Sequence, residues 1–187
     1  MAIGSQTMTL DQFLEQYADN GLLEFRNGAV VEKMAPGWPH SAISGVLGGR
    51  VNAFAETRKL AFAFPELRLI DLVEGESRVP DLAIYAWDRI ERDRMAAGVG
   101  AITPPDVVVE VASPGQSRQK QVERCREYIG SGVRIALMID PRRQRIVDVR
   151  ADGTERQLQA DDRIDFEELV PGFTLLVSEL FAAIRFE

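Results

Sequence analysis

The chain has 187 residues, of which 45% are hydrophobic and 27% charged, a composition typical of a soluble globular protein with one sizeable core. No apolar run approaches the roughly 18 residues of a membrane-spanning helix, and the N-terminus lacks the features of a secretory signal. We therefore expect a cytoplasmic protein without a membrane partner. The net charge of −7 argues against a general nucleic-acid coat but allows an enzyme with a local basic groove. The single cysteine, Cys125, excludes an internal disulfide and a cysteine-based metal cluster.

The first half of the chain alternates between helical and extended patterns. Thr9 is a predicted N-cap, and Asn27-Gly28 is a strong hairpin signal. Residues 1–8 are expected to form a flexible N-terminus. The patterns predict a helix over 10–18, a hairpin of 22–25 with 29–34, a long helix over 39–58, two or three strands within 60–86, and a short helix over 91–97.

The second half repeats this alternation, with Ser117 as a predicted N-cap. The patterns predict strands over 106–112, 133–139, 144–150 and 154–158, and helices over 117–129 and 177–184. We found no internal repeat and no linker that would divide the chain. The sequence therefore predicts a single α/β (α+β mixed sheet) domain over 1–187, with more strands than helices.

Glu110 interrupts the apolar run of 106–112, which is typical of a strand covered on both faces. An ionised carboxylate in such a strand is costly unless it is paired, hydrogen-bonded or bound to a metal. A second acid, Asp81, lies in another apolar segment, 79–85, and Glu32 lies between Val30 and Met34 on one strand face. The alternative is that these acids lie at strand ends or edges in solvent. For Asp81 and Glu110 together we favour a site for Mg²⁺ or Mn²⁺, which prefer oxygen ligands.

These segments resemble a known family. The segments that carry the resemblance are V-P-D-L-A-I-Y (79–85), P-D-V-V-V-E-V-A-S-P (105–114), E-Y-I-G-S-G-V (127–133), A-L-M-I-D-P (136–141) and N-G-A-V-V-E-K-M-A-P-G-W-P-H (27–40). Together they resemble the Uma-type restriction endonucleases of the PD-(D/E)xK nuclease superfamily, over roughly residues 9 to 183.

The resemblance implies a restriction-endonuclease-like core with flanking helices and an N-terminal helix plus hairpin. It implies Asp81 and Glu110 as ligands of Mg²⁺ or Mn²⁺, with Glu32 and His40 as supporting site residues. It also implies DNA as the substrate and a homodimer as the assembly.

The chain departs from the family where a lysine is expected. The superfamily lysine, two residues after the acid, is replaced by Ala112. Members of the family place an aspartate and a lysine four residues apart on the next helix, and here those positions hold Lys120 and Arg124. Either Lys120 or Arg124 supplies the positive charge of the site, or both lie on a solvated helix face. Arginine can stabilise phosphate charge but cannot act as a base, and the only other lysines are Lys33 and Lys59.

Two further features have alternative interpretations. His40, the only histidine, is either a packing residue at a helix N-terminus or part of the site. Arg142, Arg143, Arg145 and Arg150 are either a solvated turn or a grip for a DNA backbone.

The sequence therefore predicts a Mg²⁺- or Mn²⁺-dependent endodeoxyribonuclease with Asp81, Glu110, Lys120, Arg124, Glu32 and His40 at its site. The alternative is a catalytically degenerate nuclease fold that binds nucleic acid or protein. A third possibility is a metal-dependent hydrolase of a non-nucleic substrate, which would lack a basic groove beside the acids.

Overall fold

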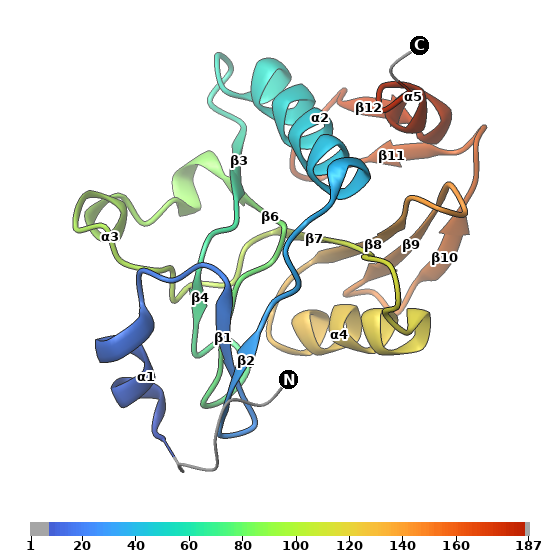
Figure 1. Ribbon diagram of the computed structural model, residues 1–187. Helices are drawn as coiled ribbons and strands as arrows, with labels where there is room; N and C mark the ends of the chain where they lie inside the picture. Colours follow the sequence, from blue (N-terminus) through green and yellow to red (C-terminus); the bar gives the residue numbers. More distant parts are fainter. Residues whose placement is uncertain (1–7, 186–187) are drawn as a thin grey trace.

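The computed structural model describes residues 8–185, so the segment expected to be flexible lies outside the described residues except for Met8. The chain runs from the N-terminal hairpin into a mixed sheet with a long helix between them (Figure 1). The elements of the first half are α1 (Leu10–Tyr17), β1 (Leu23–Arg26), β2 (Ala29–Glu32), α2 (Trp38–Ala55), β3 (Ala61–Pro65), β4 (Leu69–Ile70), β5 (Ser77–Arg78), β6 (Leu82–Ala86), a 3-10 turn (Trp87–Arg89) and α3 (Arg92–Ala96).

The second half continues the sheet and ends in a short helix. Its elements are β7 (Val107–Val111), α4 (Arg118–Gly130), β8 (Ile135–Asp140), β9 (Arg145–Arg150), β10 (Glu155–Leu158), β11 (Arg163–Asp165), β12 (Thr174–Leu176) and α5 (Val177–Ala182). No helix among residues 8–185 has both the length and the apolar character that crossing a bilayer requires.

Local chemistry explains several of these boundaries. Thr9 and Gln12 form a reciprocal capping box at the start of α1, and the Ser117 side chain caps α4. Asn27 and Gly28 have φ angles of 50° and 75°, the two left-handed residues that a tight hairpin turn requires. These predictions are confirmed. The prediction of two or three strands within 60–86 was wrong, because four form there, and β11 and β12 were not predicted.

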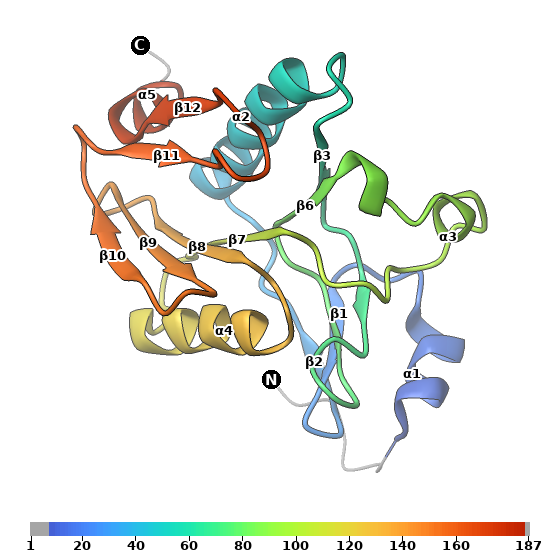
Figure 2. The ribbon, with the colours of Figure 1, turned by 180° about the vertical axis from the view of Figure 1, so that it is seen from behind.

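The main sheet has six strands in the order β10-β9-β8-β7-β6-β3. Only β7 and β8 are parallel, and α4 is the crossover that connects them. Helices α2 and α4 lie on opposite sides of this sheet, and β11, β12 and α5 lie beside α2 (Figures 1 and 2). The predicted mixed sheet with flanking helices is confirmed.

Alternate side chains of β7 contribute to two different hydrophobic cores. Val107, Val109 and Val111 pack in the core that includes α2 and α5, whereas Val108 packs in the core that includes α4. Glu110 lies two residues after Val108 and therefore on the same face of β7, so its side chain emerges on the α4 side of the sheet. Strand alternation therefore directs this one acid toward the helix that carries Arg124.

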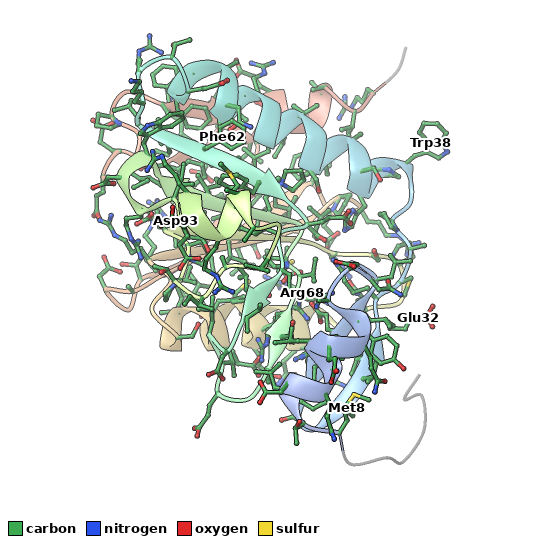
Figure 3. The ribbon with its side chains drawn as sticks, turned by 90° about the vertical axis from the view of Figure 1, so that its left-hand side faces the viewer. Met8, Glu32, Trp38, Phe62, Arg68 and Asp93 are labelled. Carbon is green, nitrogen blue, oxygen red and sulfur yellow. The ribbon has the colours of Figure 1, made fainter. Side chains whose placement is uncertain are left out.

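A smaller four-stranded sheet, in the order β2-β1-β5-β4, carries the N-terminal hairpin. Arg68 fixes α1 to this sheet and lies in the interior of the molecule (Figure 3). Its guanidinium donates to the carbonyls of Ala18, Leu23 and Asn20 and to the hydroxyl of Ser77. One buried cation thus satisfies the backbone where α1 ends and β1 begins.

We predict that Arg68→Met lowers the free energy of unfolding by about 3 kcal/mol, because buried carbonyls lose a charged donor. Urea unfolding followed by circular dichroism measures this change. The exposed Arg50 on α2 provides a control, and Arg50→Ala should change stability by less than about 0.5 kcal/mol. Equal effects of the two substitutions would contradict the role given to Arg68.

Candidate active site

Asp81 and Glu110 meet at the junction of β6 and β7. Asp81 lies just before β6 rather than within the strand, which corrects the predicted strand over 79–85. Its Oδ2 accepts a hydrogen bond of 2.7 Å from the backbone N–H of Val111, the residue after Glu110. Both acids are buried, with 4% and 6% of their surface exposed. The pairing of these two strands therefore brings two carboxylates, 29 positions apart in the sequence, to one point of the sheet.

Arg124 lies between Glu110 and a third acid, Glu24 of β1. Its Nε donates to Oε1 of Glu110 at 2.7 Å, and its two terminal nitrogens donate to the two carboxylate oxygens of Glu24. The hydroxyl of Tyr128, one turn later on α4, also donates to Oε1 of Glu110 at 3.0 Å. Arg124 thus joins α4, the central sheet and the hairpin. The alternative of a solvated helix face was wrong for Arg124, which is buried.

The side chains of His40 and Lys33 also contact Asp81. Nε2 of His40, near the start of α2, lies 2.9 Å from Oδ2 of Asp81. Nζ of Lys33 donates to the carbonyl of Val79 at 2.7 Å and lies 3.5 Å from Oδ1 of Asp81. Lys33 follows β2 directly, so the hairpin, rather than the strand of Glu110, brings a lysine next to Asp81.

The environments of the acids shift their pKa values in opposite directions. Burial by itself would raise the pKa of Asp81, but His40, Lys33 and the Val111 N–H outweigh burial and hold this pKa below its ordinary value. Burial raises the pKa of Glu110. Arg124 opposes this rise, and the negative charges of Asp81 and Glu24 add to it. An additional cation would therefore stabilise the ionised form of Glu110 more than that of Asp81.

A cleft of about 600 Å³ opens over these residues. Its walls carry seven acidic side chains and, apart from His40, four basic ones, a surplus of three negative charges before His40 is counted. A phosphate would be repelled from such a cleft unless a further cation balanced the charge. The acidic walls therefore favour a bound cation.

The other predicted site residues lie at the rim. Glu32 and Lys120 both line the cleft, but both are exposed and neither side chain forms an ion pair within residues 8–185. Figure 3 shows Glu32 projecting outward from the molecule. His40 contacts Asp81, as the site interpretation required. The structure thus brings together Asp81, Glu110, Arg124 and His40, and leaves Glu32 and Lys120 outside the buried cluster.

Sequence reasoning did not identify Glu24 and did not assign Lys33 to the site. Glu24 alternates with Leu23 and Phe25, which pack against Phe13, and this pattern alone indicates an ordinary half-buried strand. The only signal was indirect, since a buried Arg124 needs more than one carboxylate to satisfy its donors. Lys33 lies near the end of the predicted strand over 29–34, on the face of Val31, and alternation alone does not show that this face meets Asp81.

The acids fit a divalent ion bound by two side chains. Oε2 of Glu110 accepts no hydrogen bond from any residue between 8 and 185, and Oδ1 of Asp81 has only the 3.5 Å contact with Lys33. In the same described range, no group of three or more His, Cys, Asp or Glu side chains is arranged for a metal. Water or substrate oxygens would complete the coordination, as is usual for Mg²⁺.

Comparisons with known proteins identify the family and the fold. The family model of Uma2, described as "Putative restriction endonuclease", matches residues 10–178. The crystal structure of a "putative nuclease belonging to DUF820" from Anabaena variabilis ATCC 29413 is similar, with a TM-score of 0.83 and 26% identity. That similarity covers 95% of this chain and 99% of the other. No curated protein sequence matches the chain.

The mixed sheet and its flanking helices thus define a nuclease-like fold, and the site lies where the acids of two neighbouring strands meet. The chain belongs to the Uma2 family, as the match over most of its length shows.

We predict that Glu24→Gln lowers the free energy of unfolding at pH 7 by about 3 kcal/mol. Burial would raise the pKa of Glu24, but Arg124 and the Val79 N–H hold it at about 2, against an ordinary value of 4.5. A lowered folded-state pKa contributes stability above about pH 4.5, and this contribution is lost as the pH falls toward 2. Urea unfolding of both proteins at pH 7, 5 and 3 should show the difference shrinking by about half at pH 3.

The exposed Glu32 is the matched control for this series. Glu32→Gln removes the same charge from the same hairpin and should change stability by less than about 0.5 kcal/mol at every pH. A Glu24→Gln deficit that stays constant from pH 7 to pH 3 would show that lost packing, rather than the ion pair with Arg124, is responsible.

Proposed function

We propose that this protein is a divalent-metal-dependent nuclease that hydrolyses phosphodiester bonds of DNA. The proposal rests on one observation: Asp81 and Glu110 meet at the floor of an acidic cleft. Each of these acids has one carboxylate oxygen that accepts no short hydrogen bond from the described residues. Membership of a nuclease family supports the same reaction. Mg²⁺ or Mn²⁺ held by these acids would neutralise phosphate charge and lower the pKa of a bound water.

The remaining residues have roles that their contacts support. His40 and the Val111 N–H orient Asp81 and keep it ionised. Arg124 and Tyr128 hold Oε1 of Glu110, and Oε2 accepts no hydrogen bond from the described residues. Lys33, the only lysine within 4 Å of Asp81, is placed to contact a phosphate oxygen or an attacking water at the cleft floor. Arg124 already donates four hydrogen bonds, to Glu110, Glu24 and Tyr128, which makes Lys33 the better candidate for this role.

The metal site is tested by calorimetric titration with Mn²⁺. We expect the wild type to bind, and Asp81→Asn and Glu110→Gln each to weaken binding more than about 100-fold, because even the loss of an outer-shell partner costs 10- to 100-fold. Asp148→Asn is the matched control, because Asp148 is a buried strand acid paired with Arg150 and Arg156 outside the cleft. Its Mn²⁺ affinity should equal that of the wild type.

A specific observation favours a second candidate function. Arg124 satisfies one oxygen of Glu110 and both oxygens of Glu24, so the cluster is partly neutralised without any metal. A nuclease fold that had lost catalysis and acts as a binding module would show this arrangement. A wild type that binds neither Mn²⁺ nor Mg²⁺ would support this second candidate and contradict the nuclease.

Substitution of Lys33 and substitution of Lys120 should affect the rate of DNA cleavage differently. Lys33→Met should reduce the rate of plasmid nicking by about 100-fold. It should leave Mn²⁺ affinity equal or higher, because a positive charge beside Asp81 is removed. Lys120→Met should change the rate less than about twofold, since Lys120 contacts no acid of the cluster. The reverse order of effects would assign the phosphate-binding role to Lys120 and contradict the role of Lys33.

The proposal includes a homodimer, in which two sites would act on opposite DNA strands. Light scattering on the purified protein measures the assembly directly, and a monomeric mass would restrict the proposed reaction to one strand at a time.

A further inference from the structure

A groove lined with arginines continues from the acidic cleft. The groove has a volume of about 170 Å³, and its lining shares His40, Ser113 and Gln116 with the cleft. A smaller hollow of about 80 Å³ follows, and Arg118 and Arg143 line both. The acidic cleft and the two hollows thus form one continuous path across the surface.

The topology explains why the arginines gather there. Strands β7 and β8 are parallel, so their carboxyl ends lie at the same edge of the sheet. Strand β7 leads into the start of α4, which carries Arg118, and β8 leads into the turn that carries Arg142 and Arg143. Arg145 begins β9 on the other side of this turn. The start of α2 borders the same groove through Gly37 and Pro39.

The charge of this path differs sharply from that of the cleft. The two hollows are lined by four arginines, Arg118, Arg142, Arg143 and Arg145, and by a single acid, Asp140. All four arginines are exposed, in a protein whose net charge is −7. This cluster is therefore a local exception to the charge of the molecule, and it adjoins the proposed site.

Asp140 builds the turn and pairs with only one of the four arginines, Arg143. Its carboxylate accepts hydrogen bonds from the backbone N–H groups of Arg142 and Arg143, at 3.0 and 3.1 Å, and from the Arg143 guanidinium at 3.0 Å. These bonds fix the backbone on which the arginines stand. In the described part of the chain, the side chains of Arg142 and Arg145 form no hydrogen bond or ion pair, so their donors remain available.

We propose that this path, the arginine groove of Arg118, Arg142, Arg143 and Arg145, binds the phosphodiester backbone of a nucleic-acid strand and leads it into the acidic cleft. The inference rests on the proposed nuclease function and names where its substrate is held. Guanidinium groups match the geometry of phosphate oxygens, and the positive end of the α4 dipole, at Arg118, adds to the attraction. Binding outside the cleft also resolves how a polyanion approaches a site whose own walls are acidic.

The double variant Arg142→Ala/Arg145→Ala tests the groove and leaves the Asp140–Arg143 pair intact. The control is Arg50→Ala/Arg163→Ala, which removes two exposed arginines on α2 and β11 and changes the net charge equally. Fluorescence anisotropy follows a labelled 20-nucleotide single strand, and separately the corresponding duplex, from 50 to 200 mM salt. The titrations are made once with EDTA and once with Ca²⁺ in place of Mg²⁺.

We expect the groove variant to bind about 10- to 100-fold more weakly than the wild type at 50 mM salt. The slope of log affinity against log salt should fall by about 1.4 for the single strand, because each phosphate contact contributes about 0.7. The control should lose much less affinity and keep the wild-type slope. Equal losses in the two double variants, or a wild type that binds neither probe in either buffer, would overturn the proposal.

The assay separates this inference from the proposed reaction. Asp81→Asn removes a negative charge from the cleft, so it should bind the strand at least as tightly as the wild type. Strand binding that depends on the groove, in a protein that fails to bind Mn²⁺, would uphold the groove and reject the metal-dependent reaction. Mn²⁺ binding by a protein whose strand affinity is unchanged in Arg142→Ala/Arg145→Ala would uphold the metal site and reject the groove.

Discussion

The burial of Glu110 is the constraint on which the site depends. A carboxylate in the middle of a covered strand is stable only when its charge is matched, and here Arg124 and Tyr128 of α4 provide the match. Arg124 in turn has donors that one carboxylate cannot satisfy, and Glu24 of the hairpin accepts two of them. The sheet, the helix and the hairpin are therefore held together by one chain of charged contacts.

This balance has a consequence for function. A buried cluster in which every charge is paired is a structural device, and many such clusters contribute little net stability. The cluster here is incompletely balanced. Burial, together with the charges of Asp81 and Glu24, keeps the pKa of Glu110 raised despite Arg124, and the cleft above it carries an excess of negative charge. Arg124 stabilises the architecture of the site, and the unmatched charge that remains is what a divalent cation would balance.

The sequence predicted the parts of this arrangement that depend on local chemistry. The caps at Thr9 and Ser117, the turn at Asn27-Gly28 and the apolar strand around Glu110 all have signals within a few residues. The strands that were missed are two or three residues long, too short for a periodic pattern.

The candidate site was likewise predictable only where its residues have a signal in the local sequence. Asp81 and Glu110 were conspicuous as acids in apolar segments. The burial of Glu24 depends on Arg124, which lies 100 positions later, and the contact of Lys33 with Asp81 spans 48 positions. Neither relation has a signal in the local sequence, because both are created by the way the hairpin packs on the sheet. The direction of Arg124 was also undecided until α4 was placed against Glu110.

The measurement that tests the central claim most directly is anomalous diffraction from crystals of the wild type soaked in Mn²⁺. The account predicts a manganese peak beside the carboxylates of Asp81 and Glu110, with Arg124 still bonded to Glu24. A site without a peak, in which Arg124 and Lys33 alone satisfy the three acids, would contradict it and leave a nuclease fold stabilised by its own ion pairs.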